Sequence, residues 1–240
     1  MDMYFLIFIV VLFSVVQSIF GVGLLLFGTP TLLLFGYSYG ETLWILLPSS
    51  VAISAVQIIG SYDLVRAKRE VYFFTIPALV AGLMFIMTSD ELIDIGKIVG
   101  GTLLFVGMVR LSSNLQGLMK IFIKTNIGLY YLIMGGVHGI SNMGGGPLSV
   151  LMTTVHSDKD SIRTNIAYVY LIFGISQLTV LFFLSSHVFQ LVDVWFSVIA
   201  LSAYFLVGRV WAQSIDVERF HSLITVLILI YGAVPFLGLK

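Results

Sequence analysis

The chain has 240 residues, of which 59% are hydrophobic and only 10% are charged, and its basic and acidic residues cancel to a net charge of zero. A soluble domain carries about 25% charged residues, so this composition predicts an integral membrane protein. The absence of cysteine excludes disulfides, thiol catalysis and cysteine-ligated metals, and we expect neither a metal nor another cofactor. Because the chain has no basic tail, nucleic acid is not an expected partner.

Apolar stretches separated by short charged patches predict about eight membrane-spanning helices. They cover residues 3–20, 43–59, 71–88, 95–111, 126–140, 163–184, 194–208 and 220–237. The apolar N-terminus lacks a basic region and a small-residue cleavage site, so we expect a span there rather than a signal peptide. The expected fold class is all-α, a polytopic transmembrane helical bundle.

Two uncharged stretches, residues 3–40 and 125–157, are too long to be single spans. As straight helices they would be about 50 Å or longer, whereas the hydrocarbon core of a bilayer is about 30 Å thick. Glycines interrupt both near the middle, in "FGVGLLLFGTP" and "SNMGGGP", and in a helix interior Gly costs about 1 kcal/mol and Pro about 3 kcal/mol relative to Ala. Each stretch therefore predicts a discontinuous element, in which a helix, a break and a shorter half-helix follow one another.

The two halves of the chain resemble each other. A shift of 121 residues aligns Gln17 with His138 and residues 21–23 with 142–144, and a shift of 123 residues aligns "VYFF" with "VWFS". This pattern predicts an internal duplication within one membrane domain, with repeats at 1–120 and 121–240, as is common in transporters.

The basic residues favour an inverted arrangement of these repeats. If each broken element enters and leaves on one side, 10 of the 12 basic residues share a side, whereas a single crossing divides them 7 to 5. Since cytoplasmic loops collect Lys and Arg, we expect both termini outside, and the loops at 61–70, 112–124 and around Lys159 in the cytoplasm.

The glycine breaks predict an anion-binding site near the midplane. Non-helical backbone at membrane depth is stable only where it is buried in protein or lines a cavity. A half-helix that begins after the break presents unpaired N–H groups and the positive end of its dipole, and Gly144, Gly145 and Gly146 carry no side chain that would keep an anion away. Pro147 suits the first helical position. The alternative is that the glycines only allow helices to pack closely.

His138 is the intramembrane side chain in this region that can change charge near neutral pH, and it precedes Asn142 by one helical turn. It is expected either to couple protons and contact the anion, or to be a neutral histidine bonded to a neighbouring helix. For its repeat equivalent Gln17, packing is the preferred interpretation. Polar residues on the next span of each half could complete the site, with Gln57 and Asn165 preferred among Pro48, Ser49, Ser50, Gln57, Thr164, Asn165, Ser176 and Gln177.

The string "GISNMGGGPLSVLM" resembles the second-half signature of the sulfite exporter TauE/SafE family, and "GVGLLLFGTPTLLLFG" looks like its first-half counterpart. Gly21, Gly23, Pro30 and Gly36 fit the family spacing, whereas Leu24, Leu25 and Asn142 stand where the family usually has glycine. The resemblance implies a secondary transporter that exports small anions, often sulfur oxyanions or organosulfonates, across the inner membrane.

The predicted substrate site combines these residues. Backbone and amide donors are expected from Asn142, Gly144, Gly145, Gly146, Gly21 and Gly23, with further contacts from His138, Gln17, Gln57 and Asn165. The expected partners are the anion, the bilayer, and protons or another coupling ion, while the oligomeric state stays open. The sequence contains no Walker motif, so nothing in it suggests the use of ATP. The alternatives are a channel-like anion pathway and a membrane-embedded enzyme, for which His138 alone supplies no acid–base pair.

Overall fold

The computed structural model describes residues 3–66, 69–89, 94–184, 191–214 and 217–236, and within these ranges the chain is helical and contains no strand. The all-α prediction is therefore confirmed. Five of the helices are long and apolar enough to cross a membrane, or six if one bent pair forms a single span. These helices are compatible with a membrane protein. The count of about eight spans stays a prediction, because several other apolar helices are shorter than a full span.

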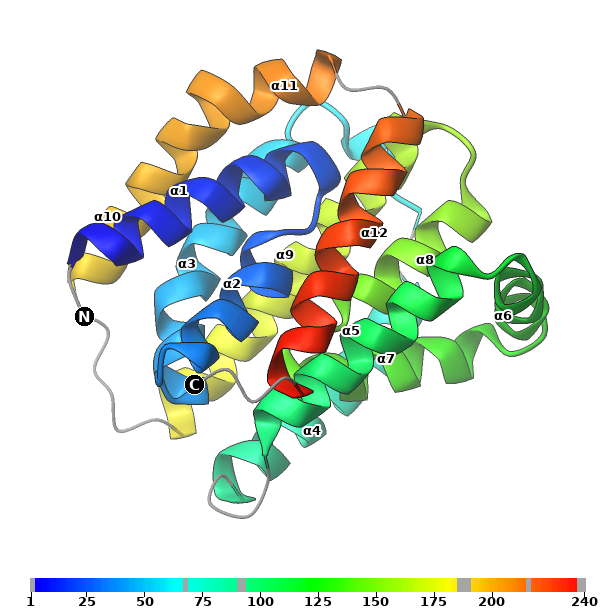
Figure 1. Ribbon diagram of the computed structural model, residues 1–240, viewed down its shortest axis with the longest axis horizontal. Coiled ribbons are helices and arrows are strands. Elements are labelled where there is room, and N and C mark those ends of the chain that lie inside the picture. Colours follow the sequence, from blue (N-terminus) through cyan, green and yellow to red (C-terminus); the bar gives the residue numbers. More distant parts are fainter. Residues whose placement is uncertain (1–2, 67–68, 90–93, 185–190, 215–216, 237–240) are drawn as a thin grey trace.

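The elements follow one another in two similar series (Figure 1). The first series is α1 (Met3–Phe20), α2 (Leu24–Leu34), α3 (Tyr39–Ile58), the short turn η1 (Tyr62–Leu64), the π-helix η2 (Val71–Thr75), α4 (Ile76–Ser89) and α5 (Ile95–Leu111). The second is α7 (Ile127–Ser141), α8 (Gly145–Val155), α9 (Lys159–Leu184), α10 (Leu191–Ala203), the π-helix η3 (Tyr204–Gly208), α11 (Arg209–Ser214), α12 (Val217–Ala233) and the turn η4 (Val234–Phe236). Both expected discontinuous elements are present, as α1 with α2 and α7 with α8.

The segment 112–124, which the sequence suggests is a loop, is helical instead. It forms α6 (Ser113–Thr125), which joins the two series and turns by 104° from the axis of α5. In Figure 1 this helix stands at the edge of the molecule. Leu118 and Ile121 are both 62% exposed, while lysines occupy other positions of the same helix. An amphipathic helix at a right angle to an apolar one is typical of a helix that lies along a membrane surface.

Helices α3 and α9 pack against each other at the centre of the molecule and run in opposite directions. Val51 of α3 contacts Gly174 in the middle of α9. The segment that follows α3 is bonded to Asn165 near the start of α9 through Leu64 O. At the other end, Tyr39 donates to Gly139 O, next to the part of α7 that contacts the second half of α9.

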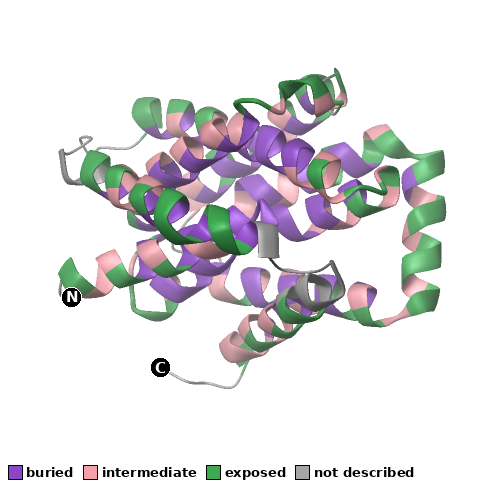
Figure 2. Cartoon of the chain, turned by 90° about the horizontal axis from the view of Figure 1, so that it is seen from above, coloured by how far each residue is buried: buried purple, intermediate pink, exposed green. Residues whose placement is uncertain are grey.

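The most extensive of the remaining contacts between the two series are reciprocal. Helix α4 packs on α7, and α10 packs on α1, so the corresponding helix of each series covers the broken element of the other. Helix α5 packs on α12 in the same way. Figure 2 shows that the buried residues gather in the middle of this bundle and that exposed residues follow the outer faces. The two broken elements are therefore enclosed by helices from both halves of the chain.

Candidate functional site

The two breaks have the same backbone geometry. Gly21 and Asn142 each end the preceding helix with a left-handed conformation, at φ values of 72° and 64°. The N–H of Gly21 donates to Gln17 O and that of Asn142 donates to His138 O, both over 2.8 Å. Glycine adopts this conformation freely and asparagine does so more readily than most residues. The residue shift of 121 thus matches equivalent positions, and Asn142 preserves a turn that a glycine would also allow.

The polar side chain one turn before each break caps the half-helix that follows. The N–H of Leu24 donates to Gln17 Oε1 over 3.3 Å, and the N–H of Gly144 donates to His138 Nδ1 over 3.2 Å. Each side chain satisfies one of the N–H groups that lack an intrahelical partner at the start of α2 or α8. In this conformation the Gly144 N–H, which the sequence analysis assigns to an anion, is therefore bonded to the chain itself.

Two glycines make this capping possible. A Cβ atom on Gly23 would lie 2.5 Å from Gln17 N, and a Cβ atom on Gly144 would lie 2.6 Å from His138 Cβ. Only glycine therefore allows the returning backbone to approach the end of the first helix so closely. Of the other predicted glycines, Gly146 faces Val106 of α5.

His138 begins a chain of side-chain hydrogen bonds across the second break. Its Nδ1 accepts from Gly144, so the ring hydrogen is assigned to Nε2, which donates to Gln177 Oε1 over 3.1 Å. Gln177 Nε2 donates to Asn142 Oδ1 over 3.3 Å, and Asn142 Nδ2 donates to Thr29 Oγ1 over 2.7 Å. All four side chains are fully buried. The cluster therefore holds a neutral histidine and connects α7, α9 and α2.

Two aromatic residues of α9 complete the surroundings of the second break. Phe173 stacks on the His138 ring with centroids 4.0 Å apart. Tyr170 is fully buried, and its hydroxyl has no hydrogen-bond partner among the described residues. A Cβ atom added to Gly145 would collide with this hydroxyl. The Tyr170 Oη atom thus lies directly against the first residue of α8. A buried donor without a partner lowers the stability of the folded protein by about 1–3 kcal/mol, unless a ligand accepts its hydrogen bond.

The first break is held by α3. Gln17 Nε2 lies 3.2 Å from both Ser50 Oγ and Ser54 Oγ. Gln57 Nε2 donates to Gln17 O over 3.1 Å and to Ser18 O over 3.2 Å, at the end of α1. Its Oε1 is buried without a partner in the described part of the chain. Gln17 is therefore more than a packing residue, since it both caps α2 and anchors α3.

A cavity of about 510 Å³ lies beside this first break. Its lining includes Gln57, Ser61, Arg163 and Arg209, and Tyr204 of the π-helix η3. Such π-helical turns are frequent at functional sites. Gln57 lines this cavity and also bonds the last turn of α1, so it links the first break to a cavity whose wall contains two arginines, one of which, Arg163, lies 3.9 Å from Asp160.

Asn165 lies away from the histidine cluster. Its side chain accepts from Arg66 N over 2.7 Å and donates to Leu64 O and Ser161 O over 2.9 and 2.8 Å. It fixes the segment after α3 to the first turns of α9, whereas Gln177 lies near the other end of that helix. The structure thus gathers His138, Asn142 and the second glycine string at one break, and Gln17, Gln57 and the first string at the other. These three side-chain bonds of Asn165 reach neither break, although its neighbours Arg163 and Ile166 lie against Gly21.

Sequence reasoning missed two residues of the second break. Tyr170 precedes Gln177 by two helical turns, so helical periodicity could have placed both on one face. Thr29 gave no signal, because only tertiary packing brings α2 to Asn142.

No protein-family model, curated protein or solved structure matches the chain. Among the described residues, no group of three or more His, Asp or Glu side chains could hold a metal ion.

Proposed function

We propose that the protein is a secondary transporter that exports small anions across the inner membrane, with sulfur oxyanions or organosulfonates as the substrate class. The resemblance to the TauE/SafE family supports the substrate class. The observation that carries the proposal is the buried Tyr170 hydroxyl, which lies without a partner among the described residues against Gly145 at the start of α8.

The start of α8 offers the donors that an anion needs. In this conformation the Gly144 N–H donates to His138 Nδ1 and the Gly146 N–H donates to Met143 O over 3.3 Å, and Pro147 has no N–H. The Gly145 N–H is therefore the backbone donor of the first turn that is left for an anion, and the positive end of the helix dipole points to the same place. Tyr170 Oη adds a hydroxyl, and Asn142 Nδ2 adds an amide that now donates to Thr29. None of these groups carries a negative charge. Because His138, Asn142 and Gln177 are fully buried, this conformation is closed, and binding requires α8 to separate from α9.

His138 links a proton to the anion in this proposal. A proton on Nδ1 removes the acceptor of the Gly144 N–H, so that protonation frees this donor and places a positive charge beside it. Anion and proton therefore favour the same state, and each raises the affinity for the other.

The arrangement of the helices supports inverted repeats. Equivalent helices α3 and α9 run in opposite directions, and the packing of α4 on α7 and of α10 on α1 is reciprocal. The cavity with Arg163 and Arg209 then faces the cytoplasm and gives access to the first break. Both termini would lie outside; residues 1–2 and 237–240 are not among the described residues. Single cysteines at Ser113 and Lys159 should react with an impermeant thiol reagent only from the cytoplasmic side.

Flux measurements in proteoliposomes test the function. Purified protein should move ³⁵S-labelled sulfite or thiosulfate with saturation, with acceleration by unlabelled anion on the opposite side, and with a dependence on the pH gradient. A channel would show flux without this acceleration, and an enzyme would change the anion chemically. Empty liposomes and a labelled cation serve as controls. Absence of flux for every sulfur oxyanion and sulfonate tested would contradict the proposed substrate class.

A further inference from the structure

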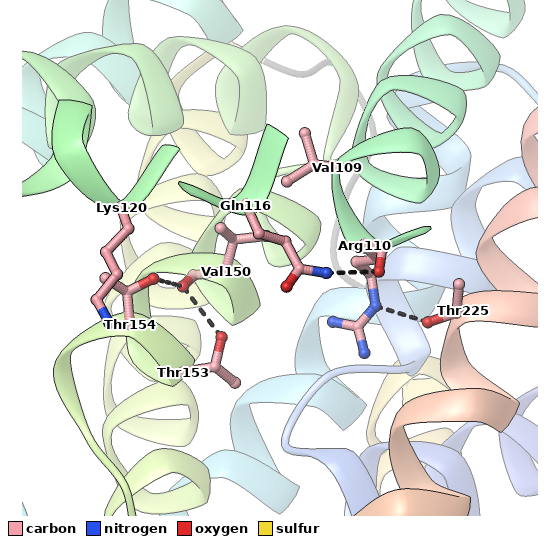
Figure 3. A pocket seen from close by; sticks show the side chains of 8 residues that line it. All are labelled: Val109, Arg110, Gln116, Lys120, Val150, Thr153, Thr154 and Thr225. Carbon is pink, nitrogen blue, oxygen red and sulfur yellow. Dashed lines mark hydrogen bonds between the residues drawn. The ribbon is translucent and has the colours of Figure 1, made fainter. Parts of the chain in front are cut away.

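A second basic cavity lies between the kink of α5 and α6, the end of α8, and α12. Its volume is about 400 Å³, and its lining includes Arg110, Gln116, Lys120, Thr153, Thr154 and Thr225 (Figure 3). None of its lining residues is acidic, so the cavity wall carries two positive charges. Figure 3 shows the guanidinium of Arg110 and the side chain of Lys120 on two sides of the cavity. None of the residues that line this cavity belongs to either helix break.

Hydrogen bonds fix Arg110 at this position. Its Nε donates to Thr225 Oγ1 over 2.9 Å, and one terminal nitrogen lies 3.4 Å from Ser149 Oγ. Gln116 Nε2 donates to Arg110 O over 2.7 Å and so binds α6 back onto the end of α5. The 104° kink therefore places Lys120 of α6 and Arg110 of α5 on one cavity.

An apolar cavity of about 410 Å³ adjoins the basic one, and the two share Val109 and Val150 in their walls. Its other lining residues include Gly101, Phe105, Phe122 and Ile133. Phe105 and Ile133 are 51% and 47% exposed, so the apolar cavity opens on the outer face of the bundle. A positively charged space thus borders an apolar one beside the amphipathic helix α6, with Val109 and Val150 in their common wall.

We propose that these two cavities together bind one anionic phospholipid. Its phosphate lies between Arg110 and Lys120, and one acyl chain passes Val109 and Val150 into the apolar cavity. Basic pockets between membrane helices attract anionic head groups, and each basic residue near the surface contributes about 1 kcal/mol, or about fivefold in affinity. The apolar cavity is the reason to assign a lipid rather than a free oxyanion. This inference requires the chain to lie in a bilayer but does not depend on transport.

Native mass spectrometry of delipidated protein tests this assignment, with phosphatidylglycerol, phosphatidylcholine and glycerol 1-phosphate as separate probes. Lys120→Gln removes a charge from the basic cavity, and Gly101→Leu fills the apolar one; a Cβ atom at Gly101 meets no atom within 4 Å, so the variant should fold. Lys124→Gln is the matched control, because Lys124 is an exposed lysine of α6 that does not line the cavity.

We expect one phosphatidylglycerol per chain, binding about fivefold weaker in Lys120→Gln, clearly weaker in Gly101→Leu, and unchanged in Lys124→Gln. Phosphatidylcholine should bind more weakly than phosphatidylglycerol. Three results would overturn the proposal. One is binding of glycerol 1-phosphate with no effect of Gly101→Leu, which would assign a free oxyanion. The second is an equal loss of binding in both lysine variants, which would indicate surface charge alone. The third is no binding of added phosphatidylglycerol by the wild type.

Discussion

Asn142 Nδ2 donates a hydrogen bond of 2.7 Å to Thr29 Oγ1, which joins the break between α7 and α8 to the half-helix α2 of the other half of the chain. Both groups are fully buried. Any movement that opens the second break has to stretch or replace this bond. If the proposed anion takes the amide of Asn142, the link between the two broken elements weakens, and binding would then be coupled to conformational change.

Replacing Asn142 by glycine should distinguish the role of the Asn142 side chain from that of its left-handed backbone conformation. Gly21 shows that glycine fits this left-handed position in the first half, so Asn142→Gly loses only the bonds to Thr29 and Gln177. We expect anion binding to weaken by about 1–3 kcal/mol, as for the loss of a bond to a charged partner. Asn142→Ala should cost about 1–2 kcal/mol more in stability through left-handed strain. Equal melting temperatures of the two variants would contradict the role of the turn.

Replacing His138 by glutamine should preserve the fold, because Gln17 caps α2 in the equivalent position. The variant can still accept from the Gly144 N–H but cannot hold an extra proton. We expect near wild-type melting and flux that no longer depends on pH. His138→Leu is the comparison, since it leaves Gly144 and Gln177 unpaired and should destabilise the protein by about 1–3 kcal/mol. Unchanged pH dependence of flux in His138→Gln would exclude this histidine as the coupling group.

Substituting Gly145 should be far more damaging than substituting a glycine on the preceding helix. A Cβ atom at Gly145 collides with Tyr170 Oη, whereas a Cβ atom at Gly136 has no atom within 4 Å. We therefore expect a lower melting temperature and lost flux for Gly145→Ala, and normal behaviour for Gly136→Ala. Adding Tyr170→Phe to Gly145→Ala removes the colliding oxygen and should recover part of the stability. If the two alanine variants melt alike, the close packing at the start of α8 is not present in the protein.

The start of α9 should give a pH-dependent contribution to stability. Asp158 Oδ1 accepts from Ser161 N over 2.7 Å, and the bonds to Ser161 hold the pKa of this carboxyl below its ordinary value. A lowered folded-state pKa stabilises the protein above the ordinary value of about 4, and this stabilisation disappears as the pH falls through the folded-state pKa. Asp158→Asn keeps a side chain that can cap the helix but loses the carboxylate. Between pH 6 and pH 3 its melting temperature should therefore fall less than that of the wild type. An equal fall of the melting temperature in Asp158→Asn and the wild type would contradict this role of the carboxylate.

Most helices could be predicted well from the sequence, because local composition alone marks an apolar run and the charged residues at its ends. The predicted limits 3–20 and 95–111 are those of α1 and α5, and both glycine breaks are present. Helix α6 was missed because its apolar residues are spaced by lysines and polar residues, which resembles a solvated loop when only mean hydropathy is considered.

The details of the site were less accessible to sequence reasoning. The alignment of Gln17 with His138 located two side chains that both cap the half-helix after a break, although the residue types differ. The partner of the Gly144 N–H could not be predicted, because it depends on the direction in which the chain returns after Asn142. Among the polar residues of this span Asn165 was preferred to Gln177, yet the packing of α7 against the far end of α9 decides which amide reaches the histidine.

Anion binding to the Tyr170→Phe variant tests the central claim most directly. The Tyr170 hydroxyl has no partner among the described residues, so its removal should leave the melting temperature equal or higher. If the hydroxyl donates to the anion, the dissociation constant for ³⁵S-labelled sulfite or thiosulfate should rise about tenfold or more, as expected for a hydrogen bond to a charged group. An unchanged dissociation constant in a stable, transporting variant would show that the anion does not bind at the start of α8.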